Sequence, residues 1–163
     1  VDSNDKYFFH KPSADFTFGL NTTLTYKNWT LAASGHGSLG NYVYNNVASD
    51  QEMIADCWTN NFSSNRLNSA AWSNFHQACY LSDYYIKDAS FFKIDNVTVG
   101  YTFPSLFKSA KLDRALGLNV FATVQNVATI TKYEGLDPEV YSGIDNNLYP
   151  RPRTYVLGLK FNF

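Results

Sequence analysis

The stretch RTYVLGLKFNF (153–163) places the polar residues Thr154, Lys160 and Asn162 between regularly spaced apolar side chains. The apolar side chains occupy every second position: Tyr155, Leu157, Leu159, Phe161 and Phe163. Successive side chains of a β-strand point to opposite faces of a sheet, so this pattern predicts a strand with one apolar and one polar face. Chain ends are usually polar and loosely held. We therefore expect this strand to be held by neighbouring strands.

Four earlier segments repeat the alternation and predict four more strands. They span residues 15–26, 29–45, 91–103 and 116–131, and in the second the alternation is read from Trp29 to Leu39. The dipeptide KN at 27–28 is typical of a tight turn, so the first two segments predict a hairpin. In the third segment Phe92 and Ile94 fall on the polar side, which predicts either a bulge near Asn96 or a locally apolar lining. Pro104 is expected to end that strand.

Short and long connections alternate between these strands. Residues 46–86 and 132–152 lack a sustained period and predict two long loops. This arrangement is typical of outer-membrane β-barrels, whose strands need only about 9–11 residues to cross a bilayer. Five strands cannot close such a barrel, and an open sheet edge cannot face hydrocarbon. The sequence therefore predicts an all-β fold, in which residues 1–163 form part of a transmembrane antiparallel β-barrel that is not closed by itself.

The composition is consistent with strands that face two different environments. Aromatic residues make up 17% of the chain, yet the mean hydropathy is −0.29. No run of about 18 apolar residues is present, so no transmembrane helix is expected. The net charge of −1 gives no electrostatic reason to expect nucleic-acid binding. The opening VDSNDKYFFHKP reads like the interior of a loop, so we expect a fragment of a longer chain.

The sequence offers no catalytic, cofactor or metal site. The three histidines, His10, His36 and His76, lack metal-ligand spacing. Asp83, Asp88 and Asp95 do not form a calcium-loop pattern and are interpreted as solvated acids. No Gly-rich phosphate loop or Gly-X-Ser-X-Gly motif occurs. An enzyme is therefore not expected.

Cys57 and Cys79 are compatible with one disulfide or with two free thiols. Both lie in the long loop at 46–86, which we expect on the extracellular side, where oxidation is permitted. We therefore predict a Cys57–Cys79 disulfide.

Several aromatic residues and one arginine are candidates for contact with a substrate or a partner. They are Trp58, Trp72, Tyr84, Tyr85, Tyr133 and Arg151. The aromatic rings could stack on sugars or pack on a partner, and the alternatives are packing within the loop or anchoring at the lipid headgroups. Arg151 and Arg153 of YPRPR could contact lipopolysaccharide, the neighbouring loop, or Glu134 and Asp137. Locking of the loop is favoured because two prolines already stiffen the segment.

Three motifs narrow the prediction to one family. They are YYIKDASFFKIDNVTVGYTFP (84–104), VQNVATITKYEGLDPEV (124–140) and GIDNNLYPRPRTYVLGLKFNF (143–163). Together they resemble the carboxy-terminal end of the SusC/RagA-like TonB-dependent outer-membrane transporters of Bacteroidetes. The resemblance covers roughly residues 84–163, and residues 13–45 fit the same barrel more loosely.

This resemblance implies the last five strands of a barrel of about 22 strands in the bacterial outer membrane. It implies extracellular loops, a periplasmic carboxy terminus and import of glycan or peptide nutrients beneath a SusD-like lipoprotein. The plug and the region that contacts TonB would lie outside this chain. By the same resemblance, the apolar residues from Tyr155 to Phe163 form the signal read by the barrel assembly machinery.

Two alternatives belong to other classes. One is a soluble all-β module that binds carbohydrate through its aromatic residues, which solubility without detergent would distinguish. The other is a barrel assembled from several copies of this chain, which the intact mass of a longer parent chain would eliminate.

Overall fold

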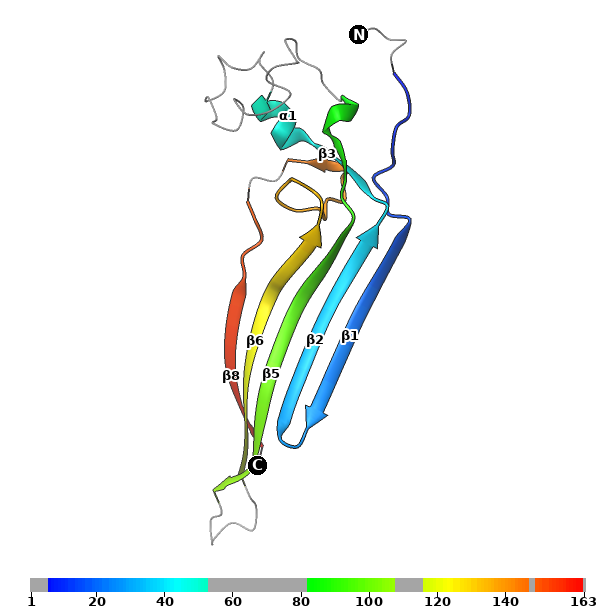
Figure 1. Ribbon diagram of the computed structural model, residues 1–163. Helices are drawn as coiled ribbons and strands as arrows, with labels where there is room; N and C mark the ends of the chain where they lie inside the picture. Colours follow the sequence, from blue (N-terminus) through cyan, green and yellow to red (C-terminus); the bar gives the residue numbers. More distant parts are fainter. Residues whose placement is uncertain (1–5, 53–81, 108–115, 147–148, 163) are drawn as a thin grey trace. The chain divides into compact units, whose positions relative to one another are not determined.

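The computed structural model describes residues 6–52, 82–107, 116–146 and 149–162 (Figure 1). The chain divides into two compact units. The small-sheet unit comprises Val1–Phe16, Ser38–Phe91 and Thr131–Pro150. The large-sheet unit comprises Thr17–Gly37, Phe92–Ile130 and Arg151–Phe163. No helix in the described residues is long and apolar enough to span a membrane.

The large-sheet unit holds most of a five-stranded sheet with the order β1-β2-β5-β6-β8. Its strands are β1 (Phe16–Tyr26), β2 (Trp29–Leu39), β5 (Phe91–Phe107), β6 (Leu116–Thr131) and β8 (Thr154–Asn162). Neighbouring strands run in opposite directions (Figure 1). All five predicted strands are confirmed, and β1 and β2 are joined by the predicted turn at 27–28, where Lys27 has a φ of 52°.

The sheet has two open edges in the part of the chain that the structure describes. Strand β1 lies at one edge and β8 at the other, and they do not pair with each other. This confirms the prediction of an all-β barrel segment that is not closed by itself. One detail of the prediction is wrong, because β5 continues through Pro104 to Phe107. Proline removes one backbone donor but keeps an extended φ, so a strand can continue through it where that donor is not needed.

The pairing of β6 with β8 sorts the two faces of the sheet. On one face each apolar residue of β8 lies opposite an apolar residue of β6: Leu118↔Phe161, Val120↔Leu159, Ala122↔Leu157 and Val124↔Tyr155. The other face carries pairs such as Asn119↔Lys160 and Gln125↔Thr154. We call these the apolar face and the polar face of the sheet.

Strand β5 contains a bulge, which is one of the two explanations that the sequence analysis offered for its irregular pattern. Ser34 and His36 lie on one face of β2, two positions apart. Their side chains contact those of Asn96 and Asp95, which are adjacent in sequence. Two adjacent residues can face the same side only where the alternation is interrupted, so the bulge lies at Asp95–Asn96. It brings Phe92 onto the apolar face, where its ring stacks against Phe18.

The small-sheet unit contains elements that the sequence pattern did not predict. Its sheet has the order β4-β3-β7, with β3 (Tyr42–Asn45), β4 (Ile86–Asp88) and β7 (Ile144–Asp145). Strand β3 is antiparallel to β4 and parallel to β7. It leads into the helix α1 (Asn46–Glu52), and a 3-10 helix (Asp83–Tyr85) precedes β4. Buried Val43, Ala89 and Tyr133, with Val140 packed against them, form the core.

Candidate functional site

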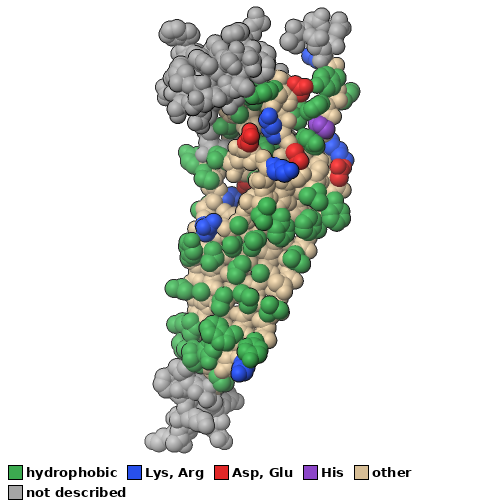
Figure 2. All heavy atoms as spheres, viewed as in Figure 1, with side chains coloured by type: hydrophobic (Ala, Val, Ile, Leu, Met, Phe, Trp, Pro, Cys, Tyr) green, Lys and Arg blue, Asp and Glu red, His purple; other side chains and the backbone are tan. Residues whose placement is uncertain are grey.

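The apolar face of the large sheet is the most extensive candidate surface. Large apolar side chains on this face remain exposed in β1, β2, β5 and β8, up to 84% for Leu157. Figure 2 shows hydrophobic side chains covering the visible face of these strands, with few charged ones among them. Examples are Leu20, Leu24, Leu31, Val99, Tyr155, Leu157, Leu159 and Phe161. A contiguous apolar face of this kind is typical of contact with another apolar medium or a partner.

Close packing on the apolar face depends on two glycines of β2. The ring of Phe18 lies over Gly37, and the ring of Phe92 lies beside Gly35. A Cβ atom built on Gly35 would lie only 2.6 Å from the carbonyl oxygen of Lys93. The two phenylalanine rings stack with their centroids 5.8 Å apart. Glycine is therefore required at position 35 for β2 and β5 to approach this closely.

Aromatic residues gather near the turn that joins β1 and β2. Trp29 meets Tyr101 edge to face with centroids 4.9 Å apart, and Tyr101 meets Phe103 at 4.6 Å. The ammonium of Lys27 lies 5.4 Å from the ring centre of Tyr26. Aromatic belts with neighbouring lysines are typical of the level where a membrane protein meets lipid headgroups.

The polar face carries hydrogen bonds that join three neighbouring strands. Between β2 and β5, His36 Nδ1 lies 2.8 Å from Asp95 Oδ2, and Asn96 Nδ2 donates to Ser34 Oγ at 2.6 Å. Between β5 and β6, the hydroxyls of Thr98 and Thr123 lie 2.8 Å apart, and Asn119 Nδ2 donates to Thr102 Oγ1 at 2.7 Å. Polar side chains of this face therefore pair across neighbouring strands, as expected for the interior wall of a barrel.

The segments VQN and PRPR, which carried part of the family resemblance, contact each other. Asn126 has a φ of 54°, and its Nδ2 donates to the carbonyls of Arg151 at 2.8 Å and Pro152 at 3.3 Å. Arg153 adds two hydrogen bonds between the same segments. Its Nη2 donates to the carbonyl of Val127 at 2.8 Å, and its Nε donates to the carbonyl of Asn126 at 3.4 Å. Arg153 therefore joins the segment before β8 to strand β6, and the locking of a loop by Arg151 and Arg153 stays a prediction.

A buried tyrosine–carboxylate pair closes the loop that follows β6. Tyr133 Oη donates to Asp145 Oδ2 at 2.8 Å, and Asp145 is only 1% exposed. Burial, and then the hydrogen bond to Asp145, raise the pKa of Tyr133. Within the loop the side chain of Asp137 accepts from the backbone of Glu139 at 2.9 Å. Residues 133–145 thus form a compact loop with its ends joined.

A second carboxylate organises the passage from β4 to β5. The Ser90 hydroxyl and the Ser90 backbone N–H both donate to Asp88 Oδ1, at 2.5 and 2.8 Å. Both bonds lower the pKa of Asp88, and the bond from the Ser90 hydroxyl has the larger effect. A lowered pKa means that the bonds stabilise the turn above the ordinary pKa of the carboxyl and are lost as the pH falls through the lowered value.

The predicted contact residues fall into three groups. Tyr85 is 1% exposed and Tyr133 is buried, which favours the alternative of packing within the loops for both. Tyr84 is 37% exposed, with the Lys87 ammonium 4.8 Å from its ring centre, and Arg151 is exposed. The other two predicted contact residues, Trp58 and Trp72, lie outside the described part of the chain. So do the predicted disulfide cysteines, Cys57 and Cys79, and Phe163 of the predicted assembly signal.

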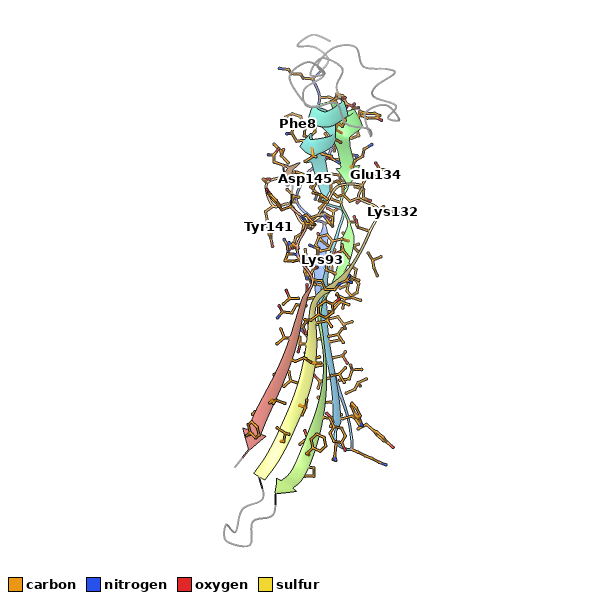
Figure 3. All side chains as sticks on the ribbon, turned by 90° about the vertical axis from the view of Figure 1, so that its left-hand side faces the viewer. Phe8, Lys93, Lys132, Glu134, Tyr141 and Asp145 are labelled. Atoms are coloured by element: carbon orange, nitrogen blue, oxygen red, sulfur yellow. The ribbon has the colours of Figure 1, made fainter. Side chains whose placement is uncertain are left out.

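The structure also exposes aromatic residues that the sequence pattern did not single out. Tyr141 is 94% exposed and projects away from the loop (Figure 3). Phe8 is fully exposed in the same unit. Neither residue belongs to a periodic segment, so the only available signal was an apolar residue within a polar stretch. Among the described residues, no group of three metal-ligating side chains comes together.

Comparison with known proteins gives relatives over the whole chain. It is 43% identical over 166 residues to the TonB-dependent receptor SusC of Bacteroides thetaiotaomicron, and 27% identical over 179 residues to the TonB-dependent receptor P3 of Formosa agariphila. Both alignments cover 100% of this chain, which spans 16% of SusC and 18% of P3. No protein-family model matches the sequence.

Solved structures share the fold. The RagAB peptide importer in its closed-closed state matches 100% of this chain and 20% of its own, with a TM-score of 0.79 at 22% identity. The open-open state of the same importer matches 94% of this chain, with a TM-score of 0.75. The resemblance first seen in three motifs thus extends over the whole sequence and the fold. Over its whole length, this chain is therefore similar to a carboxy-terminal barrel segment of the SusC/RagA-like TonB-dependent receptors.

Proposed function

We propose that this chain forms part of the wall of a TonB-dependent outer-membrane transporter. The observation that carries the proposal is the two-faced sheet, which has an exposed apolar face, a hydrogen-bonded polar face and two open edges. Such a sheet fits a barrel wall, with the apolar face toward lipid and the polar face toward the interior. The 43% identity to SusC supports the same role. The barrel-segment fold does not favour a soluble carbohydrate-binding module.

We further propose that the complete transporter imports glycan or peptide nutrients together with a SusD-like surface lipoprotein. SusC is named as a TonB-dependent receptor, and RagAB is described as a peptide importer. The plug and the TonB contact would be supplied by regions outside this chain. The loops at 46–86 and 132–152 are proposed to be extracellular and to contribute to the rim beneath the lipoprotein, with the carboxy terminus in the periplasm.

The exposed residues of the small-sheet unit are the candidates for this partner contact. Tyr84, Tyr141 and Leu136 present apolar surface in this unit. Arg151, which is exposed in the large-sheet unit, remains a separate candidate. Tyr133 and Tyr85 would support these side chains from the core rather than contact the partner themselves. Trp58 and Trp72 remain candidates from the sequence alone.

A photo-cross-linking amino acid at position 141, in the protein as its host cell produces it, tests the orientation and the partner. We expect capture of a surface lipoprotein, because Tyr141 is exposed on the compact loop at 133–145. The same probe at buried position 133 serves as the control and should capture little. Capture of periplasmic proteins alone would contradict the proposed orientation.

Uptake measurements test the activity itself. Deleting the gene should abolish growth on one glycan or peptide source, and inactivating TonB should have the same effect. Growth that depends on the gene but not on TonB would contradict energised transport.

A further inference from the structure

The apolar pattern of β8 does not determine its register against β6. Tyr155, Leu157, Leu159 and Phe161 lie on one face of β8, and Leu118, Val120, Ala122 and Val124 face them from β6. A shift by one residue would move every side chain to the other face. A shift by two residues keeps each side chain on its face and still places most apolar residues opposite apolar ones. The pattern therefore excludes odd shifts and leaves even shifts open.

One packing contact on the polar face discriminates between even shifts. Phe121 lies opposite Gly158, and its ring occupies the space that a Cβ atom of residue 158 would take. A shift by two residues would place Phe121 opposite Val156 or Lys160. This contact favours the observed register, but a phenylalanine ring can turn away from a larger neighbour.

The contacts of Asn126 and Arg153 depend on register more strictly. The ladder runs as far as Gln125↔Thr154, and Asn126 leaves it with a φ of 54°. Its side chain then reaches the carbonyls of Arg151 and Pro152, while Arg153 reaches those of Asn126 and Val127. A shift by two residues moves β8 by about 7 Å along β6, which is beyond the reach of these hydrogen bonds.

The sequence around this contact restricts the alternatives further. Pro152 has no backbone N–H, so it cannot donate to a ladder that continues past Thr154. Proline also biases the preceding Arg151 to an extended conformation, which orients its carbonyl. Asparagine tolerates a positive φ better than most residues, so Asn126 can leave the ladder at little cost.

We propose that Asn126 and Arg153 form a register clamp that selects one alignment of β8 on β6 from those the apolar pattern permits. Strand β8 is an edge strand of this sheet. The register of β8 on β6 therefore also sets the position of any strand that pairs with the other side of β8. The proposal concerns how the wall is assembled and does not rest on the transported substrate.

Cysteine cross-linking in the protein as its host cell produces it tests the clamp. Val120→Cys with Leu159→Cys reports the observed register, and Val120→Cys with Leu157→Cys or Phe161→Cys reports a shift by two. Residues directly opposite each other lie within disulfide range, whereas diagonal pairs lie farther apart. The cross-linked peptides are located by mass spectrometry after digestion, so that bonds to Cys57 or Cys79 are recognised. Each pair is combined with Asn126→Asp and Arg153→Gln, or with the milder Asn126→Gly and Arg153→Lys.

With the clamp intact we expect the in-register cross-link alone. Removing the clamp should shift cross-linking toward a slipped pair, and the milder variants should give a smaller shift. Gln125→Ala, which changes an exposed amide beside the clamp, should leave the pattern unchanged. The proposal would be overturned if only the in-register cross-link formed in both the clamp-removing variants and the milder variants. Loss of the barrel in both sets, with no slipped pair in the remaining material, would also overturn it, because the contact would then contribute stability and not register.

Discussion

At the scale of single residues, two tyrosines that look equivalent in the sequence differ in their burial. Tyr133 and Tyr141 belong to one loop, but Tyr133 is buried against Asp145 and Tyr141 is exposed. A buried carboxylate is costly unless donors surround it. The Tyr133 hydroxyl is therefore a structural group, and residue type alone could not assign that role.

Replacing Tyr133 by Phe should loosen the loop at 133–145. The substitution keeps the ring but removes a donor from a carboxylate that is 1% exposed, and such a loss costs about 1–3 kcal/mol. Hydrogen exchange in the loop should become faster. Tyr141→Phe removes the same hydroxyl from an exposed ring and should change nothing. Equal exchange in both variants would show that Asp145 does not depend on Tyr133.

Two glycines of the large sheet provide a matched pair of substitutions. A Cβ atom at Gly35 would collide with the carbonyl of Lys93, whereas one at Gly19 would have its nearest neighbour 4.0 Å away. Gly35→Ala should therefore destabilise the barrel by about 1–3 kcal/mol, as overpacking does. Gly19→Ala should be neutral or slightly stabilising. Melting of the barrel, followed by its heat-dependent gel mobility, measures both, and equal melting points would contradict the close approach of β2 and β5.

At the scale of elements, long periodic segments were predictable and short ones were not. The predicted bounds of four of the five long strands lie close to the observed ones, because nine or more alternating residues give a clear period. The second predicted segment ran to residue 45, whereas β2 ends at Leu39. Strands β3, β4 and β7 have only four, three and two residues, too few to show one. The clamp could not be predicted either, since it depends on the positive φ of Asn126 and on a contact between distant segments.

Charge on the apolar face should reveal which elements meet lipid. Leu31→Arg or Leu118→Arg should cost about 2–4 kcal/mol if the residue lies near the middle of the bilayer. Leu118→Met, which keeps an apolar side chain of similar volume, should cost much less. Folding of the barrel in lipid vesicles at increasing urea concentration measures the difference. Normal folding of both arginine variants would show that the assignment of the faces is wrong.

At the scale of the whole molecule, two open edges and an exposed apolar face mean that this segment is completed by other structure. Unpaired edge groups are not tolerated in hydrocarbon, so β1 and β8 must each find a partner strand. The sequence predicts further constraints in residues that the structure does not describe. Two of them can be tested directly.

The first is the Cys57–Cys79 disulfide. A closed loop of about 23 residues would stabilise the folded state by about 3 kcal/mol in the chain-entropy account. Peptide mapping without reduction should recover the two cysteines in one linked peptide. Two alkylated free thiols from protein collected under non-reducing conditions would eliminate the disulfide.

The second is the proposed assembly signal, which ends on Phe163. Deleting Phe163 should reduce the amount of protein in the outer membrane far more than it lowers the melting point of the barrel that forms. Burial of one phenylalanine contributes at most about 1.5–3 kcal/mol, a small part of a wall built from many paired strands. Recognition, by contrast, must occur before those strands pair, so a lost recognition residue acts on yield and leaves the finished barrel nearly unchanged. Surface labelling and barrel melting, measured side by side, separate these effects, with Phe163→Tyr as the control that retains an aromatic ring. Normal surface levels with a sharply lower melting point would identify Phe163 as a packing residue, because packing acts on the finished barrel and recognition on the chain before it forms.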